Sequence, residues 1–70
     1  MQYVDLYSLN VGDICMEDCR PQIYRVISKE FDEDFDGNMV VLEDVQTGER
    51  DKFGHKGCYG PVMILLTKAV

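Results

Sequence analysis

The chain has 70 residues, 46% of them hydrophobic, and a formal net charge of −6 at pH 7. This length is that of one small domain spanning residues 1–70, and the apolar content excludes a disordered chain. The excess of acidic residues disfavours direct contact with nucleic acid or an anionic membrane, because both carry negative charge.

The cysteine content indicates a reducing compartment. Three cysteines are present, and Met1–Asp5 lacks the basic start and apolar run of a secretory signal. An odd number of cysteines without such a signal predicts free thiols. The longest apolar run, Val62–Leu66, is too short to span a bilayer. A cytoplasmic protein with no membrane contact is therefore expected.

The first ten residues mix apolar and polar side chains at a spacing that fits either a short strand or one helical turn. Asn10–Asp13 then predicts a turn, because Gly12 is a turn residue. A short strand is expected over Asp13–Glu17, followed by a loop at Pro21, which cannot donate a backbone hydrogen bond.

Three consecutive strands are predicted in the middle of the chain. Ile23–Phe31 is rich in β-branched and aromatic residues with apolar groups on both faces, which is typical of a long, curled strand. Asn38–Val45 is expected to be the best buried, and Glu49–Phe53 is short and charged, as edge strands are. Gly48 supplies the positive φ of a hairpin turn between these last two strands.

The closing strand is predicted over Val62–Thr67. It follows Gly54–Pro61, where three glycines and a proline exclude a regular element, and which lacks the spacing of a phosphate-binding loop. Because the closing strand is apolar on both faces, it must be covered on both sides or pair with a partner chain. This leaves open a homodimer through Val62–Leu66 or through the Glu49–Phe53 edge.

The predicted order of elements is a long first loop, a central meander and a short break before the fifth strand, and it resembles an SH3-like barrel. Val11-Gly12-Asp13-Ile14 followed by Tyr24-Arg25-Val26-Ile27 also resembles the start of KOW-type and translation-factor SH3-like domains. The resemblance implies an all-β, mainly antiparallel, five-stranded barrel. The chain has no Trp, so the peptide recognition of proline-binding SH3 domains is not expected.

The KOW-type pattern also implies an alternative function as a ribosome- or RNA-associated module. Binding of an RNA phosphate backbone requires a basic surface on the protein. The hypothesis therefore requires the basic residues of the meander and the following loop to share one face: Arg25, Lys29, Arg50, Lys52 and Lys56.

The turn between the first two strands of the meander is acidic. Asp32, Asp34, Asp36, Gly37 and Glu43 match the D-x-D-x-D-G-x5-E spacing of an EF-hand calcium loop. An EF-hand needs helices on both sides, whereas both flanks here are predicted strands. An extended chain also places Glu43 about 17 Å beyond the start of the second strand, out of reach of the aspartates. A looser cation site on the three aspartates and a solvated hairpin loop remain as alternatives.

A protein-binding loop is the favoured hypothesis for this turn. Carboxylates steer the loop toward a basic surface, and Phe35 supplies an apolar contact. The predicted partner-binding residues are Glu30, Asp32, Glu33, Asp34, Phe35 and Asp36. The chain is thus expected to be a non-enzymatic inhibitor or modulator, of phage or mobile-element type, that binds a basic surface of a partner protein.

A zinc-stapled module is a further alternative. Cys15-x3-Cys19 and His55-x2-Cys58 supply the four ligands of a tetrahedral site. The opposing interpretation, which we favour, makes Cys15 a small core or flanking residue and places the other three residues in loops and turns, so no metal or cofactor is predicted. His55 and Cys58 also lack a third group to orient the base, and no catalytic residue is predicted.

Overall fold

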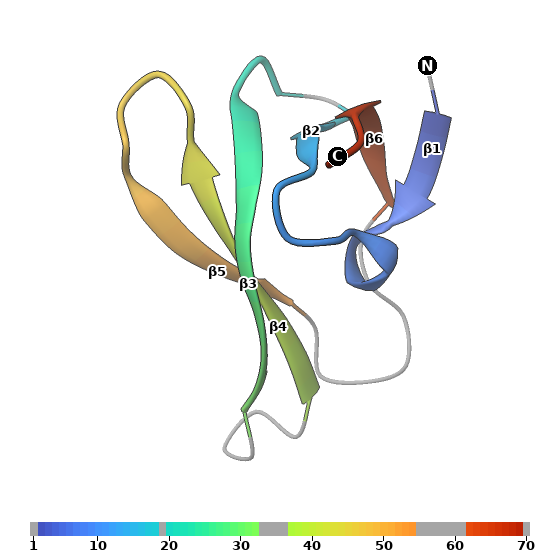
Figure 1. The fold of residues 1–70 in the computed structure, drawn as a ribbon, viewed down its shortest axis with the longest axis vertical. Coiled ribbons are helices and arrows are strands. Elements are labelled where there is room, and N and C mark those ends of the chain that lie inside the picture. The colour runs from blue at the N-terminus through green and yellow to red at the C-terminus, as the bar shows by residue number, and fades with distance from the viewer. Residues whose placement is uncertain (1, 19, 33–36, 55–61, 70) are drawn as a thin grey trace.

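A computed structural model shows the chain as a six-stranded sheet with the order β1-β6-β2-β3-β4-β5 (Figure 1). The structure describes residues 2–18, 20–32, 37–54 and 62–69. Within these residues every strand pair is antiparallel. The strands are β1 (Gln2–Asp5), β2 (Ile14–Glu17), β3 (Ile23–Asp32), β4 (Gly37–Asp44), β5 (Arg50–Gly54) and β6 (Val62–Thr67).

The all-β, mainly antiparallel class is therefore confirmed, but the number of strands was predicted wrongly. Gln2–Asp5 forms a sixth strand beside β6, and the next residues form the 3₁₀ helix η1 (Leu6–Ser8). The Asp5 carboxylate caps this helix, accepting a hydrogen bond from the Tyr7 N–H at 2.8 Å. The segment thus contains both of the structures that its spacing permits, and neither is long enough to show a clear period.

β3 is the central strand, and it serves both halves of the sheet. Its first residues pair with β2, and it pairs with β4 from Tyr24 to Asp32. The register with β4 shifts between Val26 and Ser28, which is the signature of a β-bulge. A bulge bends its strand, and Figure 1 shows β3 running past β2 at one end and along β4 at the other. The predicted curled strand is confirmed.

The sheet is open among the residues described. β6 is hydrogen-bonded on one side to β1 and on the other to β2, so it offers no free edge to a second chain. β5 pairs with β4 alone within these ranges, and the prediction that it is an edge strand is confirmed. No closing ladder joins β1 to β5 in the described part of the chain, so these two strands are the edges of the sheet.

The core lies on one face of the bent sheet and is covered by η1 and the segment after it. Leu6 and Leu9 are buried there against residues of four strands. The ring of Tyr24 contacts that of Phe53 edge-on, with the centroids 5.5 Å apart. The fully packed members are Leu6, Leu9, Cys15, Tyr24, Val26, Val40, Leu42 and Met63.

A buried aspartate connects the two ends of the chain. Asp13 is 3% exposed, and its carboxylate accepts hydrogen bonds from the N–H groups of Asn10 at 2.8 Å and Ala69 at 2.7 Å. The same turn is held to β3, because Gly12 donates to the Val26 carbonyl and Val26 donates to the Asp13 carbonyl, both at 2.9 Å. Gly12 has φ +95, as expected for a turn glycine.

We expect Asp13→Ala to lower the free energy of unfolding by about 2 kcal/mol, because it leaves two partly buried N–H groups without an acceptor. Asp13→Asn keeps one oxygen acceptor and should lose less. Urea unfolding followed by circular dichroism measures the difference. Asp51→Ala, at an exposed position of β5, is the control and should stay within about 0.5 kcal/mol of the wild type. Equal stability of Asp13→Ala and Asp51→Ala would contradict this role.

Candidate functional site

The predicted binding loop lies at the end of a two-stranded arm. The last residue of β5, Gly54, lies opposite Met39, whereas β3 and β4 continue through two further pairs to Asp32 and Gly37. We call residues 30–32 and 37–39 the β3–β4 arm. Figure 1 shows it extending beyond the remaining strands at the lower end of the view. Of the predicted residues, Asp32 ends β3, and Glu33, Asp34, Phe35 and Asp36 lie outside the described residues.

Glu30 lies at the base of the arm and is already engaged in an ion pair. Its carboxylate is 3.3 Å from the Lys52 ammonium, and the Ser28 hydroxyl donates to its other oxygen at 3.4 Å. Both charged side chains are about half exposed, so the pair adds little stability. The pair does neutralise Glu30, which makes it a weaker source of attraction for a partner than the sequence suggested.

Phe31 is the part of this site that the sequence reasoning missed. Its side chain is 63% exposed, although it lies within a strand. It lines a pocket of about 300 Å³ together with Tyr7 of η1, Lys29 of β3 and residues of β4 such as Asn38. The signal was present in the alternation, since Lys29 and Phe31 continue one side of β3 beyond the point where β5 and the core end.

Lys29 connects the arm to the 3₁₀ helix. Its ammonium group donates a hydrogen bond of 2.7 Å to the Tyr7 carbonyl oxygen. This contact joins residues from β3 and η1, and the pocket beside Phe31 lies between them. The base of the arm is thereby held against the body of the molecule, while its end projects.

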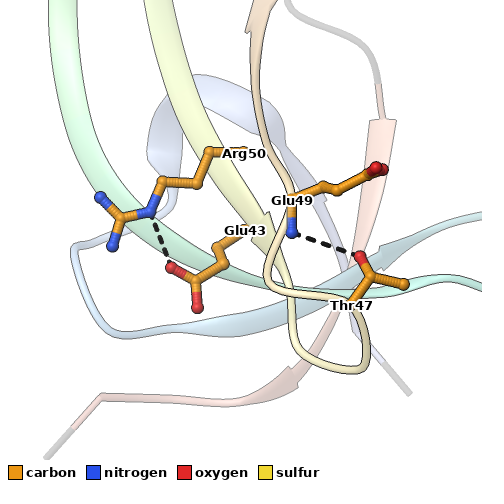
Figure 2. Close-up of polar contacts among 4 residues, drawn as sticks. All are labelled: Glu43, Thr47, Glu49 and Arg50. Atoms are coloured by element: carbon orange, nitrogen blue, oxygen red, sulfur yellow. Dashed lines mark hydrogen bonds and ion pairs between the residues drawn. The ribbon is translucent and has the colours of Figure 1, made fainter.

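The described flanks of the acidic turn do not have the arrangement of an EF-hand. Both flanks of the acidic turn are strands, as predicted, and Glu43 lies within extended β4. Its carboxylate is 2.8 Å from the Arg50 guanidinium across the β4–β5 pair (Figure 2). The Glu43 carboxylate is therefore already engaged in an ion pair. In the described ranges, no three His, Cys, Asp or Glu side chains are placed to hold a metal ion.

The turn between β4 and β5 brings Arg50 opposite Glu43. The Asp44 carboxylate accepts hydrogen bonds from the N–H groups of Gln46 and Thr47, and the Thr47 hydroxyl accepts one from the Glu49 N–H at 3.2 Å (Figure 2). Gly48 has φ +79, so the predicted glycine turn is confirmed. This tight turn places Arg50 directly opposite Glu43.

Of the described basic residues, Arg25 and Arg50 lie on one face on either side of Glu43, and Lys52 is two residues from Arg50 on the same side of β5. Arg50 is bound to Glu43, Lys52 to Glu30, and Lys29 to a backbone carbonyl. Arg25 lies opposite Glu43 in the ladder, and Lys56 is outside the described ranges. The pairing of Arg50 and Lys52 with carboxylates leaves little free positive charge on that face for an RNA backbone.

Cys15 is a core residue. Its side chain is fully buried in the main hydrophobic cluster. Burial, with a smaller contribution from the negative charge of Asp13, raises the pKa of the thiol from 9.0 to about 11. Zinc binds the thiolate, which this environment disfavours. The other three candidate zinc ligands, Cys19, His55 and Cys58, lie outside the described residues.

Comparison with protein-family models, with curated proteins and with solved structures finds no match to this chain. The described residues also contain no helix of the length and apolar character needed to cross a bilayer. The function must therefore be argued from the geometry and charge of the chain itself.

The raised pKa of Cys15 predicts a loss of stability at high pH. Below pH 9 the thiol is neutral in both folded and unfolded chains, whereas between pH 9 and about 11 it ionises mainly in the unfolded chain. The folded state is therefore destabilised as the pH rises through this window. We expect wild-type stability to fall by about 2 kcal/mol more than that of Cys15→Ala. Parallel losses in urea unfolding at pH 8.0 and above would contradict the prediction.

Proposed function

We propose that this chain is a non-enzymatic binding module that presents the end of the β3–β4 arm to a basic surface of a partner protein. The observation that carries the proposal is the projection of the arm beyond β5, with Phe31 exposed immediately before the acidic run Asp32–Asp36. An apolar side chain among carboxylates on a projecting, two-stranded support is suited to reach a surface on another molecule.

Charge supports the same function. The net charge of −6 attracts a basic surface at long range, and the unequal numbers of acidic and basic residues leave an excess after the cross-strand pairs have formed. Since Glu30 is paired with Lys52, we assign the steering to Asp32, Glu33, Asp34 and Asp36. Phe31 and Phe35 would then supply the apolar area that determines how long the complex lasts.

We infer that the fold is an open variant of the SH3-like barrel. The order β6-β2-β3-β4-β5 supports this, because a three-stranded meander follows a short strand and the last strand returns beside that strand. In this scheme β1 is an addition at the outer edge of β6. A cytoplasmic inhibitor or modulator of phage or mobile-element type is consistent with a small acidic chain that carries such an arm.

Reversal of charge in the acidic run should abolish partner binding. We expect Asp34→Lys/Asp36→Lys to lose proteins that the wild-type chain captures from an extract of its own cells, because attraction becomes repulsion. Quantitative mass spectrometry of the captured proteins provides the measurement, and the captured set should be basic. Rising salt should weaken wild-type capture.

Glu49→Lys/Asp51→Lys is the matched control. It makes the same change in net charge at two exposed positions near β5, away from the arm. Capture should survive this change, with a moderate loss from the altered net charge. If both double variants lose capture equally, net charge alone is responsible and the loop has no special role. Full capture by the loop variant would refute the proposal.

Phe31 should contribute to affinity without contributing to stability. Because its side chain is 63% exposed, we expect Phe31→Ala to change the free energy of unfolding by less than about 1 kcal/mol. Loss of an aromatic contact should weaken partner binding by about tenfold or more. Val45→Ala, another exposed apolar side chain, is the control and should leave binding unchanged. Unaltered affinity of Phe31→Ala would remove Phe31 from the site.

A further inference from the structure

A row of apolar side chains crosses four strands on the face of the sheet opposite the core. The strand registers place four residues side by side in this row: Tyr3, Ile64, Met16 and Ile23. Their chain neighbours face the core: Val4, Cys15, Tyr24 and Met63. Since successive side chains of a strand point to opposite faces, the row points away from the core. Ile64, at the centre of the row, is only 4% exposed although it is not part of the core cluster, so it adds little open surface to the row.

The row is the centre of a larger apolar surface. Val62 lies two residues from Ile64 on the same side of β6, and Ile14 has the same relation to Met16 on β2. Tyr3 and Val62 are each more than half exposed, and Ile23 is 39% exposed. We call this surface the outer apolar patch; it consists of Tyr3, Ile14, Met16, Ile23, Val62 and Ile64. Because Ile64 is already buried, the open apolar surface of the patch is that of Tyr3, Val62 and Ile23, and exposed apolar surface of this kind is suited to contact with a second molecule.

Charges of opposite sign lie at the two ends of the outer apolar patch. At one end Asp18 accepts a hydrogen bond from the Tyr3 hydroxyl at 3.4 Å, and Asp5 lies opposite Val62. At the other end Arg25 lies between Ile14 and Glu43, and because Glu43 is paired with Arg50, this end keeps a net positive charge. The two ends are separated by about four residues of strand, or about 13 Å. Along the strands, the patch therefore runs from an acidic end to a basic end. Across the strands, its central row is apolar throughout.

This arrangement is self-complementary under one particular symmetry. A two-fold axis running across the strands, along the central row, places the row of one copy on the same row of another. It also places the acidic end of each copy over the basic end of its partner. An interface of this kind is isologous, so each contact occurs twice.

We propose that two copies of this chain pack face to face through the outer apolar patch, with Asp18 of each copy against Arg25 of the other. The two sheets would then form a two-layered sandwich with the dimer axis between them. β1, β6 and β2 lie away from the β3–β4 arm in Figure 1, so both arms would stay accessible. The dimer therefore does not depend on the proposed partner of the arm.

The first experiment measures the dissociation constant of the purified chain alone by sedimentation equilibrium. Val62→Asp places a charge in the exposed part of the patch and should raise this constant by about tenfold or more. Val11→Asp is the matched control, because Val11 is also exposed but lies in the turn before β2, outside the patch. It should dimerise like the wild type, and circular dichroism should show the same fold for both variants. A wild-type chain that stays monomeric at millimolar concentration overturns the proposal, as does a dimer that Val62→Asp leaves intact.

The second experiment tests the orientation of the two copies. Asp18→Arg alone places arginine against arginine, and Arg25→Asp alone places aspartate against aspartate, so each should weaken the dimer. The double variant restores opposite charges across the axis, and dimerisation should return to near the wild-type level. Lys52→Asp changes the net charge as Arg25→Asp does, but on β5, and should have the smaller effect. Additive weakening in the double variant overturns the two-fold arrangement.

Discussion

The bend in β3 is the constraint on which the rest of this structure depends. A chain of 70 residues has few elements with which to cover a sheet, and η1 is only three residues long. The bulge near Val26 turns the two halves of the sheet toward each other, so that Cys15 and Met63 from one half meet Val40 and Leu42 from the other. The sheet thereby provides most of its own second layer, and η1 fills the remaining space.

Much of this fold could be predicted from local signals. The alternation in β3 and β4 and the glycines at positions 12 and 48 gave strands and turns close to those observed. β1 was ambiguous because four residues are too few to distinguish a period of two from a helical one. The link from Asp13 to Ala69 could not be read from sequence, because it joins residues 56 positions apart. Only a tertiary contact distinguishes that aspartate from the exposed ones.

The candidate site illustrates how pairing across strands changes the meaning of a motif. Glu43 completes a calcium-loop pattern in the sequence, but the register of β4 and β5 places it opposite Arg50, with which it forms an ion pair. Glu30 precedes the acidic turn in the sequence, but in the folded chain its carboxylate forms an ion pair with Lys52. Phe31 shows the opposite change. It was assigned only to a strand, but its side chain is one of the most exposed apolar groups among the described residues. For both glutamates the deciding neighbour comes from another strand, whereas Phe31 is exposed because β5 ends before reaching it.

An open sheet has a further consequence for how this chain behaves when it is concentrated. Its two edges are different, and the β5 edge of one molecule could in principle pair with the β1 edge of the next, extending the sheet into a filament. Both edges are poorly suited to this. β5 has three charged residues in succession, Arg50, Asp51 and Lys52, and β1 ends after four residues where Asp5 turns the chain into η1. The short length of β1 and the charges of β5 therefore disfavour edge-to-edge pairing of successive molecules.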